Sequence, residues 1–263
     1  MNYIQSNKEA WEESFDHRYP NWGDDIYKTL KSESLPFFSD DVREELKKID
    51  FSNKSVAQFC CNNGRELLSL MQLGPANGVG FDIAENIIGQ AIDTANKVNQ
   101  TNCRFVACNI LEIDSKYYNS FDFIMFTIGA ITWFEDLGQL LEKVAQCLKP
   151  GGIFFINDYH PFIGMLPMPG EEEFDSEQKN RIMYSYFRKE PWIENSGMGY
   201  ISPEFESKTF TSFSHTMSDL INASIQNGMQ IRSLQEYNYD VGMTDVYNGL
   251  GYPLSFILIA KKE

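Results

Sequence analysis

The sequence predicts a doubly wound α/β domain built on a seven-stranded, mainly parallel sheet. From about residue 55 onward, short apolar runs typical of strands alternate with longer amphipathic runs typical of helices. This alternation implies parallel strands joined by right-handed crossovers, with helices on both faces of one sheet. Near the end of the chain, two strand-like runs follow each other without a helix between them, which predicts an antiparallel closing pair.

The strands are expected where apolar and aromatic residues lie between turn signals. In chain order they are SVAQFC (55–60), GVGFDI (78–83), CRFVAC (103–108), FDFIMFTIG (121–129), GGIFFIND (151–158), QIRSLQEYNYD (230–240) and PLSFILIAKK (253–262).

The helices are expected where apolar residues recur on one helical face. The helix expected from about Trp133 onward should be stopped by Pro150 and Gly151. The runs are GRELLSLMQLG (64–74), AENIIGQAIDTANKVNQ (84–100), WFEDLGQLLEKVAQCLKPGG (133–152) and SDLINASIQNGM (218–229).

Charge narrows the range of partners. Asp and Glu number 37 against 22 Lys and Arg, for a formal net charge of −15. Such a surface repels phosphate backbones and anionic membranes over a Debye length of ~8 Å, so we expect neither nucleic acid nor membrane as a partner. The N-terminal MNYIQSNKEAWEESF has acids where a signal peptide needs an apolar stretch, and no later run approaches the ~20 apolar residues of a membrane span.

The five cysteines favour a cytoplasmic protein. They are odd in number, show no CxxC spacing and mostly lie inside apolar strand or helix patterns, so we interpret them as reduced core residues. The adjacent pair Cys60 and Cys61 leaves a redox role open, although neighbours on an extended strand point to opposite faces. The sequence carries no signal of oligomeric state.

The segment QFCCNNGRELLSL (58–70) follows the first predicted strand, where a doubly wound sheet usually binds its ligand. Gly64 opens the next helix, and its lack of a side chain permits close approach of a ligand. Asn62 and Asn63 tolerate left-handed backbone angles, so they can shape the turn. They admit a pyrophosphate less well than glycines do, which argues against NAD. On this stretch alone, a helix start with asparagine near its cap is an equal reading.

Asp82 ends the second predicted strand, 18 residues after Gly64. An acidic side chain at this point accepts hydrogen bonds from both hydroxyls of a ribose. The alternative is a solvated loop acid that caps the next helix. The spacing favours a nucleoside ligand.

Several motifs together resemble those of class I S-adenosylmethionine-dependent methyltransferases. The resemblance covers roughly residues 55–158, and the closing strand pair is similar to that family's final strands. It implies a Rossmann-like sheet and S-adenosylmethionine as the cofactor. The motifs, in order, are VAQFCCNNGRE, GVGFDIAENII, CNI, FDFIMFTIGAITWFEDL and LKPGGIFFIND.

Carried over position by position, the resemblance implies a cofactor site. Departures from the family pattern are Gln58 in place of an acid, Cys60 and Asn62 in place of two glycines, and Asn109 in place of an aspartate. The implied contacts are Phe59, Cys60, Asn62 and Gly64 with the methionine and ribose part, Asp82 with the ribose hydroxyls, Ile83 with the adenine, Asn109 and Ile110 with the adenine edge and face, and Thr127 with the cofactor after the fourth strand.

Two histidines are the candidate catalytic residues, because the pKa of imidazole suits proton removal near neutrality. His160 follows the fifth predicted strand, on the edge that faces the substrate, and Pro161 biases its backbone to an extended form. His215 starts the helix-like run HTMSDLINASI. The alternatives are a loop histidine bonded to backbone for His160 and a capping role for His215.

We expect no metal ion and no amino-methylating motif of the kind found in enzymes that modify DNA bases and protein amides. That motif, Asp or Asn followed by Pro-Pro-aromatic, is replaced here by TIGAI (127–131). Glu135 and Asp136 follow the fourth strand too late to hold magnesium, and we interpret them as first-turn acids of the next helix.

Aromatic residues are frequent in the two regions that can close over a substrate. They either pack as the core of a small lobe or line the pocket, and in the second case they favour a flat or cationic substrate. They are Trp11, Trp22, Tyr159, Tyr184, Tyr186 and Trp192.

Together these observations predict a metal-independent methyltransferase acting on oxygen or nitrogen of a small molecule. A nucleoside-binding protein without catalysis and an NAD-type oxidoreductase are the alternatives. Residues 159–214 contain the turn signal LPMPGEEE and two aromatic strand-like pieces, RIMYSYF (181–187) and KTFTSFS (208–214). The expected segments are 1–54 as an N-terminal helical lid, 55–158 as the cofactor-binding core, 159–214 as a substrate lid insertion and 215–263 as the closing helix and strand pair.

Overall fold

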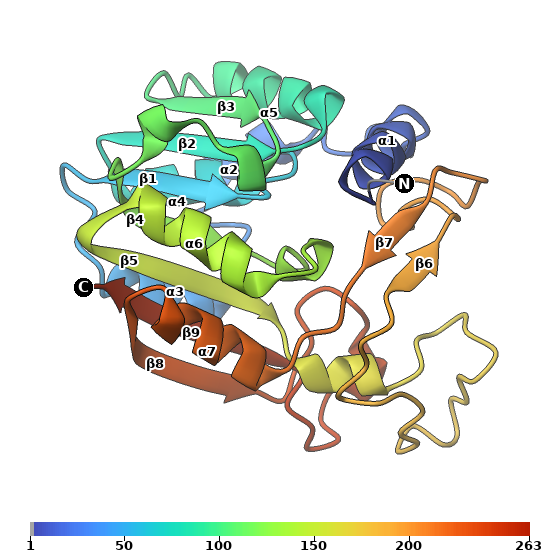
Figure 1. Ribbon diagram of the computed structural model, residues 1–263. Coiled ribbons are helices and arrows are strands. Elements are labelled where there is room, and N and C mark those ends of the chain that lie inside the picture. The colour runs from blue at the N-terminus through green and yellow to red at the C-terminus, as the bar shows by residue number, and fades with distance from the viewer. Residues whose placement is uncertain (1–2) are drawn as a thin grey trace.

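A single seven-stranded sheet forms the centre of the computed structural model, which describes residues 3–263 (Figure 1). The first two residues of the expected N-terminal segment lie outside that range. The strand order is β3-β2-β1-β4-β5-β9-β8, and β9 runs antiparallel to both of its neighbours while the other pairs are parallel. The predicted fold class is confirmed. The strands are β1 Ser55–Phe59, β2 Asn77–Asp82, β3 Cys103–Ala107, β4 Phe121–Phe126, β5 Leu148–Tyr159, β8 Met229–Tyr237 and β9 Ser255–Lys262.

Helices cover both faces of the sheet because its strands are apolar on both sides. In β4, Ile124 and Phe126 belong to the core beneath α6 and α7, while Phe123 and Met125 belong to the core on the opposite face. Figure 1 shows α6 and α7 in front of the sheet. The helices are α2 Ile26–Ser32, α3 Asp40–Lys47, α4 Arg65–Leu70 and α5 Glu85–Lys97 on one face, with α6 Leu137–Cys147 and α7 Met217–Gln226 on the other.

Two expectations about element boundaries were wrong. The helix expected over 133–152 begins at Leu137 and ends at Cys147, and β5 starts at the next residue because Leu148 is fully buried and pairs with Phe121. The piece 181–187 is not a strand. Its aromatic side chains act as anchors instead: the Tyr184 hydroxyl donates to Glu171, and the Tyr186 hydroxyl accepts from the backbone of α7.

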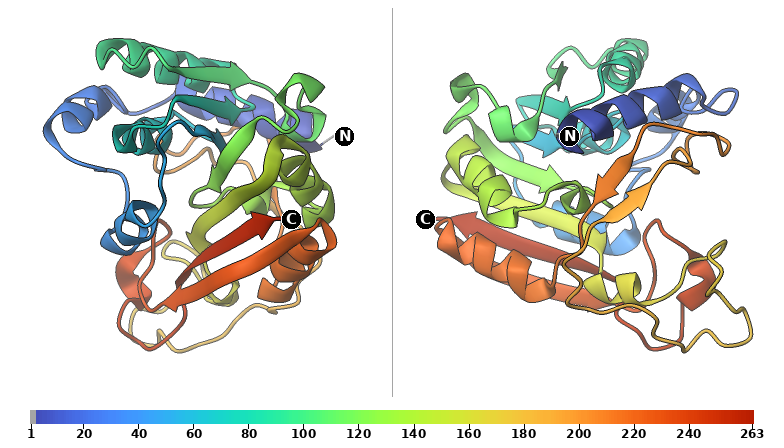
Figure 2. Two further views of the ribbon diagram at one scale, coloured as in Figure 1. Left: turned by 90° about the vertical axis from the view of Figure 1, so that its left-hand side faces the viewer. Right: turned by 45° about the vertical axis from the view of Figure 1, so that its right-hand side comes forward.

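The segment 159–214 contains a short hairpin that contacts the first helix of the chain. Its strands are β6 (Trp192–Glu194) and β7 (Phe210–Ser212), which pair antiparallel. Asn7 of α1 (Tyr3–Asp16) bonds to both backbone groups of Thr211, accepting its N–H at 2.7 Å and donating to its carbonyl at 2.8 Å. The views in Figure 2 place α1 and the hairpin together, while α2 packs against α4 and α5, and Val42 and Leu46 of α3 belong to the core on that face of the sheet.

A buried acid fixes the segment that follows β4. Asp158, at the end of β5, is 1% exposed. Its Oδ1 accepts hydrogen bonds from the N–H groups of Gly129 and Tyr159, while its Oδ2 has no partner within residues 3–263. Burial raises the pKa of this carboxyl to about 7 despite the backbone donors that favour its charged form.

Gly64→Ala should destabilise the protein strongly. Gly64 has φ +74° and a Cβ there would lie 2.4 Å from Cε1 of Phe105, so the substitution adds a core clash to the strain of a left-handed residue. We expect a loss of about 2–5 kcal/mol of unfolding free energy in urea titrations. Gly74→Ala is the matched control: its φ is +80° with no atom within 4 Å, and we expect roughly 1–2 kcal/mol. Equal losses would contradict the packing role.

Asp158→Asn should change how stability depends on pH. The folded pKa of about 7 lies above the ordinary value of 3.8, so the wild-type protein is most stable below the ordinary pKa and loses stability as pH rises towards 7. The amide stays neutral, so the variant should gain stability relative to wild type over this range, by ~4 kcal/mol at most. Urea titrations between pH 4 and 8 measure this. For Asp93→Asn, a change at an exposed residue, the unfolding free energy should vary with pH as it does for the wild type. The same parallel curve for Asp158→Asn would contradict the raised pKa of Asp158.

Candidate functional site

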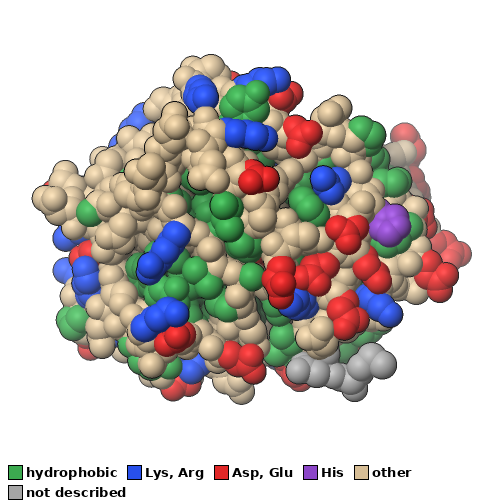
Figure 3. All heavy atoms as spheres, turned by 90° about the horizontal axis from the view of Figure 1, so that it is seen from above, with side chains coloured by type: hydrophobic (Ala, Val, Ile, Leu, Met, Phe, Trp, Pro, Cys, Tyr) green, Lys and Arg blue, Asp and Glu red, His purple; other side chains and the backbone are tan. Residues whose placement is uncertain are grey.

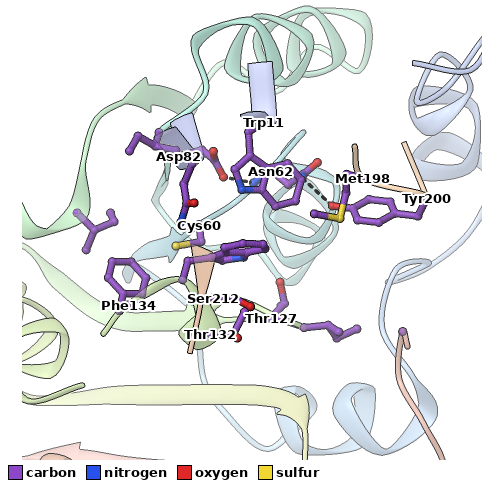
Figure 4. Close-up of a pocket in the computed structure, with 18 of the residues that line it drawn as sticks. Trp11, Cys60, Asn62, Asp82, Thr127, Thr132, Phe134, Met198, Tyr200 and Ser212 are labelled. Carbon is purple, nitrogen blue, oxygen red and sulfur yellow. Dashed lines mark hydrogen bonds between the residues drawn. The ribbon is translucent and has the colours of Figure 1, made fainter. Parts of the chain in front are cut away.

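A cavity of about 390 Å³ lies at the carboxyl ends of the central strands. The ends of β1, β2, β4 and β5 form its floor, and α1 and the β6–β7 hairpin lie over it. This is where a doubly wound sheet places its ligands. Figure 4 shows side chains from these elements pointing towards a common space, with Asp82 at one end and Met198 and Tyr200 at the other.

The loop after β1 adopts the shape of a glycine-rich turn with a single glycine. Cys60, Asn62 and Gly64 have φ values of 55°, 48° and 74°, so every second residue is left-handed. Of the two asparagines expected to allow this, Asn62 does so and Asn63 does not. The position that was not expected is Cys60, for which a positive φ is unfavourable.

Asp82 holds this loop in place. Its Oδ2 accepts the N–H of Asn62 at 2.8 Å, and its Oδ1 accepts the N–H of Ala84 at 3.1 Å. Burial raises the pKa of the carboxyl, and the backbone donors oppose that effect. Asp82 lines the cavity, and each carboxylate oxygen can accept a further hydrogen bond, so the arrangement fits a ligand that donates two hydroxyl hydrogen bonds.

The floor next to Asp82 is flat and mostly apolar. Ile83, Cys108 and Ile110 line it, and Asn109 accepts the N–H of Leu111 through Oδ1 at 3.0 Å. This bond leaves the side-chain NH₂ of Asn109 as a donor at the edge. Apolar side chains with one polar edge fit a purine ring.

The other side of the loop carries polar residues. Gln58, which is fully buried, donates from Nε2 to Thr127 Oγ1 at 2.9 Å, and Thr127 lines the cavity. Arg65 and Glu66, at the start of α4, also line it, and Arg65 Nε donates to Glu66 Oε1 at 2.7 Å. Arg65 is the only Lys or Arg in the lining among the described residues. Nothing in the sequence singled it out, although it directly follows the loop glycine.

Aromatic rings from distant segments form the end of the cavity beneath α1 and residues 192–212, which together are called the lid below. Trp11 packs edge-to-face on Trp133 with ring centroids 5.3 Å apart and contacts Tyr200 at 6.4 Å. The Tyr200 hydroxyl accepts from Nδ2 of Asn62 at 3.1 Å, which connects the lid to the loop after β1 (Figure 4). Of the six aromatic residues singled out in the sequence, Trp11, Trp22 and Tyr159 line the cavity, whereas Tyr184, Tyr186 and Trp192 do not. Trp133 and Tyr200 were not expected there, because only the tertiary fold brings them to it.

Most of the residues expected at a cofactor site lie together, and four expected site residues do not. Phe59 is fully buried in the core, and Gly64 packs on Phe105 outside the cavity lining. His160 accepts from the N–H of Phe162 and pairs with Glu236 at 2.9 Å, and His215 bonds to the carbonyl of Phe134 at 2.8 Å. Neither histidine lines the cavity. The residues that do are Cys60, Asn62, Asp82, Ile83, Asn109, Ile110 and Thr127.

The remaining features concern cysteine, metal and membrane. All five cysteines are free, and burial raises the pKa of the Cys60 and Cys61 thiols well above the ordinary value. In the described chain, no group of three or more His, Cys, Asp or Glu side chains is arranged to hold a metal ion. Asp136 caps α6 by accepting the N–H groups of Gly138 and Gln139. No helix within residues 3–263 is long and apolar enough to span a membrane.

Comparison with solved structures shows the fold. A Listeria monocytogenes protein assigned to the S-adenosylmethionine-dependent methyltransferases matches with a TM-score of 0.65 at 21% identity, over 84% of this chain and 97% of that one. The geranyl diphosphate C-methyltransferase of Streptomyces coelicolor, solved with Mg²⁺, geranyl diphosphate and S-adenosyl-L-homocysteine, matches with a TM-score of 0.62 at 11% identity. That match covers 100% of this chain and 98% of that one.

A sequence relative shares a shorter stretch. The tRNA U34 carboxymethyltransferase of Campylobacter jejuni is 26% identical over 108 residues, which are 41% of this chain and 36% of that protein.

Residues 50–190, more than half of the chain, match the family model of the methyltransferase domain. This range contains the loop after β1, Asp82 and the floor of the cavity. The chain therefore belongs to the methyltransferase-domain family, and it is a class I enzyme that uses S-adenosylmethionine as its cofactor.

Proposed function

We propose that this enzyme methylates a small molecule on oxygen or nitrogen, without a metal ion. The observation that carries the proposal is the enclosed, aromatic end of the cavity beneath α1 and the β6–β7 hairpin. Its walls are side chains of the chain itself, and a cavity of about 390 Å³ is of the size that small ligands occupy.

The cofactor would lie across the floor, in the order that the lining residues define. Asp82 would accept both ribose hydroxyls, and Ile83, Asn109 and Ile110 would contact the adenine. Cys60, Asn62 and Thr127 would border the methionine end. The free lone pairs of Asp82 and the apolar floor beside it support this assignment.

When bound, S-adenosylmethionine supplies a methyl group on a sulfonium, and transfer forms a bond to the acceptor atom as the carbon–sulfur bond breaks and leaves its electron pair on sulfur. The residues of this chain must therefore position the acceptor, exclude water and accept a proton where the acceptor carries one. Trp11, Trp133 and Tyr200 would exclude water at the lid. His160 and His215 both lie outside the lining, so we propose a proton acceptor other than imidazole.

The metal-independent mechanism is supported by the position of the acids after β4. Asp136 lies at the start of α6, where it bonds to backbone N–H groups of the first turn. It is thereby engaged as the N-cap of α6, one residue before the first turn, and Glu135 precedes the helix as well, so neither is the first-turn acid expected from the sequence.

Transfer RNA is the competing acceptor, because one relative of the chain is a tRNA-modifying enzyme. Charge opposes it. Acidic side chains gather on the half of the upper face that carries α1, a helix that contains Glu9, Glu12, Glu13 and Asp16 (Figure 3). With a net charge of −15, this lid would repel a phosphate backbone. We therefore propose no nucleic acid partner.

Asp82→Asn should weaken binding of S-adenosylhomocysteine. The amide keeps the size of the side chain and one acceptor oxygen but loses its charge, and hydrogen bonds to charged groups contribute about 1.5–3 kcal/mol each. We expect a dissociation constant roughly 10- to 100-fold higher by calorimetry. Asp93→Asn, on the exposed face of α5, should bind as wild type does. An unchanged affinity in Asp82→Asn would remove the ribose assignment.

The acceptor class can be tested by following a labelled methyl group. The enzyme is incubated with methyl-labelled S-adenosylmethionine and, in separate reactions, with total tRNA or with the fraction of a cell extract below about 3 kDa, the size range of molecules that such cavities enclose. We expect label in the low-mass fraction alone. Transfer to tRNA would overturn the proposal, as would label in neither fraction under conditions where S-adenosylhomocysteine binds.

A further inference from the structure

The lid carries one acid that faces the aromatic end of the cavity. Glu194 of β6 lies directly opposite Phe210 of β7, and directly paired residues of an antiparallel ladder put their side chains on the same face. On that face Phe210 contacts Trp11 and Trp133, with ring centroids 5.5 and 5.7 Å apart. Glu194, which is exposed and lines the cavity, therefore lies on the face of the hairpin whose Phe210 contacts the two indole rings.

The charge that the lid adds to this end of the cavity is negative. Glu194 forms no ion pair with any other residue of the 3–263 range, and in that range it is the only charged lining residue that the lid contributes. Arg65 and Glu66 bond to each other, and both lie close enough to Tyr200 to act on its pKa in opposite directions. Removal of water, followed by the negative charge of Glu171, raises the pKa of Glu194. A cation placed beside this carboxylate would oppose that shift, because it favours the charged form.

The aromatic rings that line the cavity also favour a cationic ligand. Trp11, Trp133, Tyr159 and Tyr200 line the cavity, and the faces of indole and phenol rings attract cations. The negative charge of Glu194 would repel an anionic acceptor. A neutral acceptor would gain nothing from the charge of this carboxylate.

We propose that the methyl acceptor is an amine that binds as an ammonium ion between the Glu194 carboxylate and the indole rings of Trp11 and Trp133. This inference rests on the proposed function, methyl transfer to a small molecule. The ammonium nitrogen must first lose a proton, which passes to the carboxylate of Glu194. The freed lone pair then forms the new nitrogen–carbon bond, while the electron pair of the broken carbon–sulfur bond stays on sulfur.

Binding of matched amines and alcohols tests the inference without relying on turnover. Calorimetry on the protein saturated with S-adenosylhomocysteine compares phenethylamine with 2-phenylethanol, tryptamine with tryptophol, and hexylamine with hexanol. We expect the amine to bind roughly three- to tenfold more tightly in at least one pair. Glu194→Gln should remove that preference. Glu190→Gln, an exposed acid outside the cavity lining, should retain it.

Three outcomes would overturn the inference. They are the absence of an amine preference in all pairs, a preference that survives in Glu194→Gln, and tighter binding of 3-phenylpropionate than of phenethylamine. Affinity for S-adenosylhomocysteine should be the same in wild type and both variants. Its failure to bind wild type would contradict the proposed function instead, and the pairs would then be titrated without it, so the two failures are distinguishable.

Discussion

The site depends on one hydrogen bond, from the Asn62 N–H to Asp82 Oδ2, which joins the loops that leave β1 and β2. Pairing of the two strands continues to Cys61, whose N–H donates to the Phe81 carbonyl and which lies between the left-handed residues Cys60 and Asn62. Cysteine and asparagine adopt such angles only at a cost. The acid at the end of β2 offsets part of that cost, and the same residue lines the cavity. In the proposed function, one side chain therefore both sets the shape of the loop and contacts the ribose.

The loop also reaches the lid, so the two ends of the cavity are physically connected. Asn62 bonds to Asp82 through its backbone and to the Tyr200 hydroxyl through its side chain. Tyr200 contacts Trp11 of α1, and α1 is bonded to β7 through Asn7 and Thr211. A glycine at position 62 would keep the left-handed bend but lose the bond to the lid. The side chain of Asn62 therefore has a role that glycine could not fill. It links the loop after β1, which in the proposed function borders the cofactor, to the lid that would cover the acceptor.

The sequence predicted what depends on local pattern. Alternating apolar runs identified all seven strands of the sheet, and the position of Asp82 at a strand end placed it on the cavity. Periodicity failed where tertiary contacts decide: Leu148 is drawn into the sheet by its pairing with Phe121, and the aromatic piece 181–187 is held through hydroxyl groups instead of a ladder. Trp133, Glu194 and Tyr200 carry no local signal, since their neighbours in the cavity are distant in sequence. His160 had a favourable position in the chain, but its ring pairs with Glu236 outside the cavity.

In the proposed function, the charges that line the cavity distinguish the methyl donor from the product that remains after transfer. S-adenosylmethionine carries a sulfonium cation, and S-adenosylhomocysteine is a neutral thioether. The lining contributes Asp82, Glu66 and Glu194 against Arg65, within a chain of net charge −15. A field of this sign attracts the cationic form of the cofactor and does not attract the thioether sulfur. Because transfer removes the charge from sulfur, the electrostatic contribution to binding falls when the reaction is complete. The acids that surround the cavity therefore favour both uptake of the methyl donor and release of what remains of it.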